Sequence, residues 1–266
     1  MPLCFRLIVP SLLAFSVATA QVSASNVRSA RLESIATVPD RASIHVIIRN
    51  NAARPITAFS VQFYKVQPNG QRTPCGGRGA DMIDWSDPMP GRDIYIHMRR
   101  KWIPPNGTAS FDGYPRCPDG AAPLESIQTE LSLIIFDEGS GEGDPRQMEF
   151  TFQTRQQACD ERLKWIGRFT ALRNTANLKL SSQSLYQDLV DATRSAEINP
   201  DEAARHGIAK AVRDELRGLA LDITQWAASN EPLHKNELLE WRITDLEQRT
   251  TRLVHGTGNA DVNRRE

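Results

Sequence analysis

The stretch ASIHVIIRNNAARPITAFSVQFYKV, residues 42–66, decides the fold of the first half of this chain. It has two arms in which apolar and polar residues alternate, and a bend rich in Asn, Arg and Pro joins them. The apolar residues that share a face are Ile44, Val46 and Ile48 in the first arm and Phe59, Val61 and Phe63 in the second. A period of two with β-branched and aromatic residues is typical of half-buried strands. The stretch therefore predicts a pair of β-strands.

The same alternation between turn residues predicts further strands on both sides of this pair. Their ranges are 29–38, 93–100, 108–111, 130–136 and 147–153. The Pro-Asn-Gly of residues 68–70 predicts a turn, whereas residues 71–92 and 112–124 show no period and predict long loops. Short strands at this spacing over residues 27–153 favour an antiparallel, immunoglobulin-like β-sandwich over a barrel.

At Thr154 the apolar period changes to three or four residues, which predicts an α-helical domain over residues 154–256. We expect about four amphipathic helices, the first capped by Thr154 and the third and fourth opened by Pro200 and Pro232. The first helix carries an apolar stripe of Cys159, Leu163, Ile166 and Phe169. The fold class is therefore α+β in two domains, with residues 257–266 expected to be a disordered tail. How the helices pack on the sandwich is left open.

Residues 1–20 have the features of a secretory signal peptide. Arg6 gives the positive start, an apolar run follows, and residues 18–20, Ala-Thr-Ala, form a small-residue cleavage site before Gln21. Cleavage after Ala24 is the alternative. The apolar run is too short to cross a bilayer, so we expect a secreted or periplasmic protein that does not insert into the membrane after cleavage.

The charges are balanced, with 32 Lys and Arg against 32 Asp and Glu, and neither predicted domain is strongly basic. A nucleic-acid-binding domain usually concentrates basic charge on one surface. We therefore expect no nucleic-acid partner, while a protein partner or a homo-oligomer remains open.

Export would place the cysteines that follow the signal peptide in an oxidising compartment. Cys75 and Cys117 both lie in Pro- and Gly-rich segments, which predicts a disulfide between them. Closing a loop of roughly 43 residues stabilises a fold by about 4 kcal/mol in the chain-entropy description. Cys159 lies on an apolar helical face, which favours a buried, inert thiol over an intermolecular disulfide.

Motifs for the common enzyme classes are absent from the sequence. It has no Gly-x-Ser-x-Gly elbow, no P-loop and no dinucleotide-binding glycine pattern after a strand. The histidines lack the spacing of zinc ligands, and the acids of residues 137–145 do not follow the order of a calcium loop. The sequence therefore predicts no cofactor, metal site or catalytic residue. A site formed only in three dimensions, for instance by Asp81, Asp84 and His97, remains the competing hypothesis.

Four aromatic residues lie in or beside the loops around residues 93–100: Trp85, Tyr95, Trp102 and Tyr114. Exposed aromatic rings rimmed by polar residues hold carbohydrate or peptide in many binding modules. The sequence therefore marks these residues as a possible ligand loop, with ordinary packing of the rings as the alternative.

Three segments together resemble a pattern found in uncharacterised exported bacterial proteins. They are RNNAARPITAFSVQF at 49–63, WIPPNGTASF at 102–111 and LIIFDEGSGEGDP at 133–145. The resemblance covers residues 30–150 and departs from the pattern at Glu138, which interrupts an Asp-Gly turn. It implies an immunoglobulin-like sandwich and brings no catalytic residues.

We therefore expect an exported, non-enzymatic binding or structural module. Its sandwich loops would contact a protein or carbohydrate partner, and its helices would serve for support or oligomerisation. A hydrolase or transferase is the alternative from another class.

Overall fold

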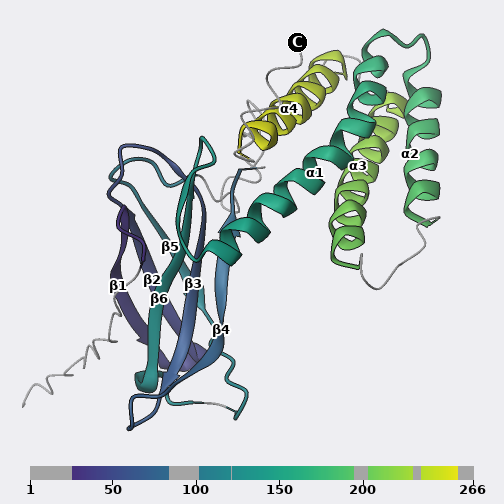
Figure 1. The fold of residues 1–266 in the computed structure, drawn as a ribbon. Coiled ribbons are helices and arrows are strands. Elements are labelled where there is room, and N and C mark those ends of the chain that lie inside the picture. Colours follow the sequence, from purple (N-terminus) through teal and green to yellow (C-terminus); the bar gives the residue numbers. More distant parts are fainter. Residues whose placement is uncertain (1–25, 84–101, 121, 195–202, 230–234, 257–266) are drawn as a thin grey trace, which may run out of the picture.

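The structure, a computed structural model, describes residues 26–83, 102–120, 122–194, 203–229 and 235–256. Strands occupy the first part of the chain and helices the second, which confirms the predicted α+β class (Figure 1). We call residues 26–144 the sheet half and residues 145–256 the helical half. The predicted strand at 93–100, the residues at which the third and fourth helices were expected to begin, and the predicted tail lie outside the described residues.

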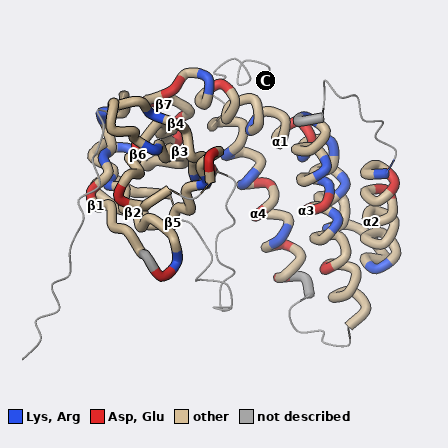
Figure 2. Tube along the Cα trace, turned by 90° about the horizontal axis from the view of Figure 1, so that it is seen from below, with Lys and Arg blue, Asp and Glu red and all other residues tan. Residues whose placement is uncertain are grey.

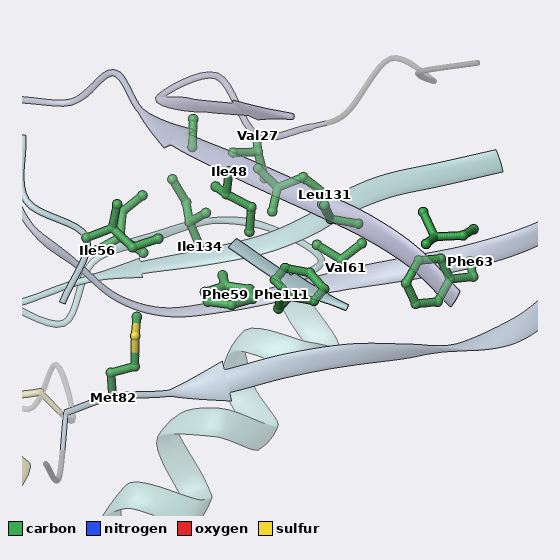
Figure 3. Packing of buried hydrophobic residues seen from close by; sticks show 14 of the residues in the cluster. Val27, Ile48, Ile56, Phe59, Val61, Phe63, Met82, Phe111, Leu131 and Ile134 are labelled. Atoms are coloured by element: carbon green, nitrogen blue, oxygen red, sulfur yellow. The ribbon is translucent and has the colours of Figure 1, made fainter. Parts of the chain in front are cut away.

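The described strands form two antiparallel sheets, one in the order β1-β2-β5 and the other in the order β4-β3-β6-β7. Their bounds are β1 Ala30–Val38, β2 Ser43–Asn50, β3 Ile56–Val66, β4 Arg72–Asp81, β5 Thr108–Gly113, β6 Ile127–Phe136 and β7 Gly141–Gly143. The apolar faces of both sheets contribute to one core, in which the rings of Phe59 and Phe111 stack 5.3 Å apart (Figure 3). The period-two pattern of residues 42–66 therefore identified the core faces.

The two arms of that stretch nevertheless belong to different sheets, β2 to one and β3 to the other. Asn50, fully buried at the bend between them, donates from Nδ2 to the carbonyls of Arg54 (2.7 Å) and Ile103 (2.9 Å). Its Oδ1 accepts the backbone N–H of Ala52 at 2.9 Å. The bend therefore carries the chain across the core and does not close a hairpin.

The disulfide between Cys75 and Cys117 is confirmed. The long loop predicted at residues 71–92 is wrong in its first part, because β4 runs there and pairs with β3. β4 contains Gly76, Gly77 and Gly79, which have no side chains to alternate. Backbone pairing formed this strand without a hydrophobic period, so the pattern search missed it.

The strand predicted at residues 147–153 is also wrong, because these residues form the first turns of α1 (Pro145–Ala171). Asp144 caps the helix by accepting the backbone N–H groups of Arg146 (2.8 Å) and Gln147 (3.3 Å), with proline at the first position. Met148 and Phe152, one turn apart, cover part of the outer face of the four-stranded sheet. The helix thus begins nine residues before the change of period at Thr154.

The other described α-helices are α2 (Leu178–Arg194), α3 (Ala203–Ala228) and α4 (Lys235–Gly256). α1 leaves the sheet half and runs into the helical half, where it contacts α3 and α4, while α2 packs on α3 (Figure 1). Acidic and basic positions are interspersed along these helices (Figure 2). None of the helices in the described ranges is long and apolar enough to cross a membrane.

The buried face of α1 differs from its predicted apolar stripe. Cys159 and Phe169 are buried as expected, but the side chain of Leu163 is 51% exposed. Arg155 and Arg162 take core positions on this helix instead.

Candidate binding groove and its arginine clamp

A groove lies on the outer face of the four-stranded sheet, between β3 and β4 and the first turns of α1, with a volume of about 470 Å³. Ser60 of β3 and Gly79 of β4 form its floor, Arg146 and Phe150 of α1 line its wall, and Asp81 closes one end. Segments far apart in the sequence therefore build it together.

Glycines keep the β4 side of the floor flat. The antiparallel register places Gly79 opposite Ser60 and Gly77 opposite Gln62. A Cβ at Gly79 would lie 2.7 Å from the carbonyl oxygen of Phe59, and one at Gly77 would lie 2.7 Å from the Gln62 side chain. A side chain therefore fits at neither Gly77 nor Gly79 without a shift of β3.

The wall is one face of α1, formed by positions 146, 147, 150 and 151. Two of its side chains are engaged within the protein: Gln147 accepts the Ser132 hydroxyl at 3.0 Å, and the Thr151 hydroxyl donates to the Gln147 carbonyl at 2.8 Å. The ring of Phe150 is 62% exposed. Arg146 is exposed as well, and its side chain makes no ion pair with any residue that the structure describes.

Arg155 fixes the end of the groove. Its side chain is 1% exposed, and its Nε and Nη2 donate to the two carboxylate oxygens of Asp81, both at 2.8 Å. Nη1 donates to the carbonyl of Gly256 at 2.8 Å and Nη2 to the Thr57 hydroxyl at 3.2 Å. A bidentate pair of this kind holds geometry tightly. This arginine clamp, made of Arg155, Asp81, Thr57 and Gly256, joins β3, β4, α1 and the end of α4.

The surroundings of the clamp are apolar. Ile83, Cys159 and Leu253 pack into one buried cluster there. A Cβ on Gly256 would come 2.6 Å from the Ile83 side chain, so any other residue here would require Ile83 to shift. The burial of Cys159 that the sequence favours is confirmed.

The described members of the predicted ligand loop, Trp102 and Tyr114, do not line this groove. Trp85 and Tyr95 lie outside the described residues. Trp102 packs against the core of the sheet half, and its Nε1 donates to the carbonyl of Met82 at 2.8 Å, as the packing alternative expected. The ring of Tyr114 is half exposed.

Of the hypothetical catalytic set, only Asp81 lies in a described part of the chain, since Asp84 and His97 do not. Both carboxylate oxygens of Asp81 accept hydrogen bonds from Arg155 of the clamp. In the described ranges, no group of three or more His, Cys, Asp or Glu residues is placed to hold a metal ion.

A second set of buried charges lies between the helices and centres on Glu161. Its carboxylate accepts Nε of Arg213 at 2.6 Å, Nζ of Lys164 at 3.0 Å and Nε1 of Trp165 at 3.1 Å. Burial alone would raise the pKa of Glu161, but hydrogen bonds from Arg213, Lys164 and Trp165 lower this pKa to about 2. Arg213 also donates to the Ala192 carbonyl at 2.6 Å. Glu161 therefore stays ionised at neutral pH and ties α1 to α3 and α2.

Comparison with models of protein families, with curated proteins and with solved structures finds no match to this chain.

Proposed function

We propose that this protein is an exported, non-enzymatic binding module. In this proposal the two sheets form an immunoglobulin-like sandwich, the groove holds a segment of a partner, and the helical half keeps the groove wall rigid. Within the described residues, the outer sheet face is the surface that supports this proposal, because Trp102 is engaged in packing and residues 72–81 form β4.

The composition of the groove carries the proposal. Among the described residues that line it, the only carboxylate is Asp81, and Arg155 binds both of its oxygens. These described lining residues include no histidine or cysteine. The groups left to face a ligand are the Arg146 guanidinium, the Phe150 ring, and the polar ends of Ser60 and Gln62. These groups suit recognition, whereas acid–base or nucleophilic chemistry needs a titratable or activated group in the site.

Export is supported by the disulfide between Cys75 and Cys117, since such bridges persist in oxidising compartments. It is supported further by the signal-like residues 1–20.

Photo-crosslinking in the native envelope fraction tests the proposal. A photoreactive phenylalanine at position 150 should give discrete cross-linked products, because this ring faces the groove. The matched control is the same residue at position 163, which is exposed on another face of α1. Equal products from both positions, or none from position 150, would contradict a binding function for the groove.

A further inference from the structure

Among the described residues that line the groove, Arg146 is the one charged side chain without an ion pair to another described residue. Asp144 is the nearest acid in sequence, and its carboxylate accepts the backbone N–H groups of Arg146 and Gln147 at the start of α1. The charge of Asp81 is matched by Arg155. Arg146 therefore offers its guanidinium, with five N–H donors, to an anionic partner at the groove wall.

An apolar contact lies beside this charge. Phe150 follows Arg146 by one helical turn on the same face, so the two side chains are offset by about 6 Å along the helix axis. Two residues of an extended chain span about 6.6 Å. A strand laid along α1 would thus bring a carboxylate to Arg146 and, two residues away on the same side, an apolar side chain to Phe150.

The floor suits a peptide backbone. Gly79 of β4 lines the groove without a side chain of its own, beside Ser60 and Gln62 of β3. The Ser60 hydroxyl accepts from Gln62 Nε2 at 3.3 Å, which leaves its own hydrogen to donate. The Gln62 carbonyl oxygen can accept a backbone N–H. A neutral saccharide would need several fixed neutral groups, but Gln147 and Thr151 are already engaged in the protein.

We propose that the groove recognises an extended peptide segment in which an acidic residue and a large apolar residue stand two positions apart. This inference rests on the proposed binding function and adds the chemistry of the partner. Arg146 binds the acid, Phe150 packs against the apolar side chain, and the glycine-rich floor accommodates the backbone.

Selection of random heptapeptides displayed on phage, with the disulfide-bonded protein as target, tests this inference. The selected peptides should be enriched in an acidic residue two positions from Leu, Ile, Phe or Met. Arg146→Glu should reverse the preference to a basic residue at the same position. Arg31→Glu makes the same charge change on β1 of the other sheet and should leave the selection unaltered.

Synthetic peptides from the selection give the affinities by fluorescence anisotropy. Replacing the acid by its amide, or Arg146 by Gln, should weaken binding about tenfold, as expected for a charged hydrogen bond. Making both changes together should cost little more than either one.

Enrichment without an acid, or the same selection from the Arg146→Glu and Arg31→Glu proteins, would overturn the inference. So would binding to a glycan array with no peptide selected. Each of these three results would leave the groove as a binding site if position 150 still cross-links, so failure of this inference and failure of the proposed function are distinguishable.

Discussion

The two halves of the molecule bury different kinds of polar group. Among the described residues of the sheet half, the buried polar residues are all uncharged: Ser43, Asn50, Thr57 and Thr129. In the helical half four of them are charged: Arg155, Glu161, Arg162 and Asp245. Apolar burial is non-directional and tolerates repacking, whereas a buried charge is stable only with its partners in place. The fold of the sheet half therefore depends mainly on its pattern of apolar residues, whereas the fold of the helical half depends also on individual charged residues and their partners.

The largest effect should come from removing the charge at the clamp. Arg155→Met leaves Asp81 and the Gly256 carbonyl without their donor and should lower the free energy of unfolding by about 3 kcal/mol. Urea unfolding followed by circular dichroism measures the loss. Arg168→Met, also on α1, is the matched control, because it breaks a half-exposed pair with Asp188 of α2 and should cost at most about 1 kcal/mol.

The same experiment can break the contrast between the halves. Ile134→Leu, a volume-conserving change in the fully buried sheet core, should cost less than about 1.5 kcal/mol. If Arg155→Met lowered the free energy of unfolding no more than Ile134→Leu, loss of a buried charge would destabilise this fold no more than a change in its apolar core, and the contrast between the halves would be wrong.

A pH dependence of intermediate size should come from Glu161. Its folded pKa of about 2 lies below the usual value of 4.5, so folding favours the ionised form. The resulting stability is complete above pH 4.5 and is lost as the pH falls towards 2. On the order of 2 kcal/mol should disappear over that range.

Urea midpoints measured in steps from pH 5 to 2 follow this loss. Glu161→Gln should be less stable at pH 7 and should show a flatter pH profile. Glu125→Gln, an exposed acid in the sheet half, serves as the control. Parallel profiles for wild type and Glu161→Gln would show that the hydrogen bonds from Arg213, Lys164 and Trp165 do not hold the ionised form.

The smallest effect should come from Leu163. The apolar stripe of the sequence predicts a buried leucine there, for which truncation to alanine costs about 2–5 kcal/mol. The structure exposes half of its side chain, so Leu163→Ala should change the unfolding free energy by less than about 0.5 kcal/mol. Leu189→Ala, at a fully buried position of α2, should show the full cost of a core truncation. Similar losses for the two variants would favour the sequence pattern over the observed packing.

The sequence predicts the sheet core well and its topology less well. Alternation assigned Val46 and Val61 to buried faces, because burial on one side of a strand needs nothing beyond a period of two. It could not assign these residues to different sheets, since that depends on Asn50 bonding to backbone groups beyond the bend. β4 escaped detection because glycine gives no alternation.

The helical half shows a different limit. Met148, Phe150 and Phe152 satisfy a strand period, while Met148 and Phe152 alone satisfy a helical one, so the pattern is ambiguous. Asp144 followed by proline was the decisive signal, because it supplies a cap and a fixed first φ. A search for apolar stripes also passes over buried arginines. The groove was missed because β4, which forms part of its floor, and the start of α1, which forms its wall, were both missed.

α1 passes from the sheet half into the helical half without a break. Its 27 residues make a rod about 40 Å long, with the groove wall at one end and the core of the helical half at the other. No tether separates the two halves along this rod, so they cannot reorient by bending a loop. Because α1 is one continuous helix, a displacement of the far helices would be transmitted along it to Arg146 and Phe150. The ion pair between Arg155 and Asp81 would be the point about which α1 turns.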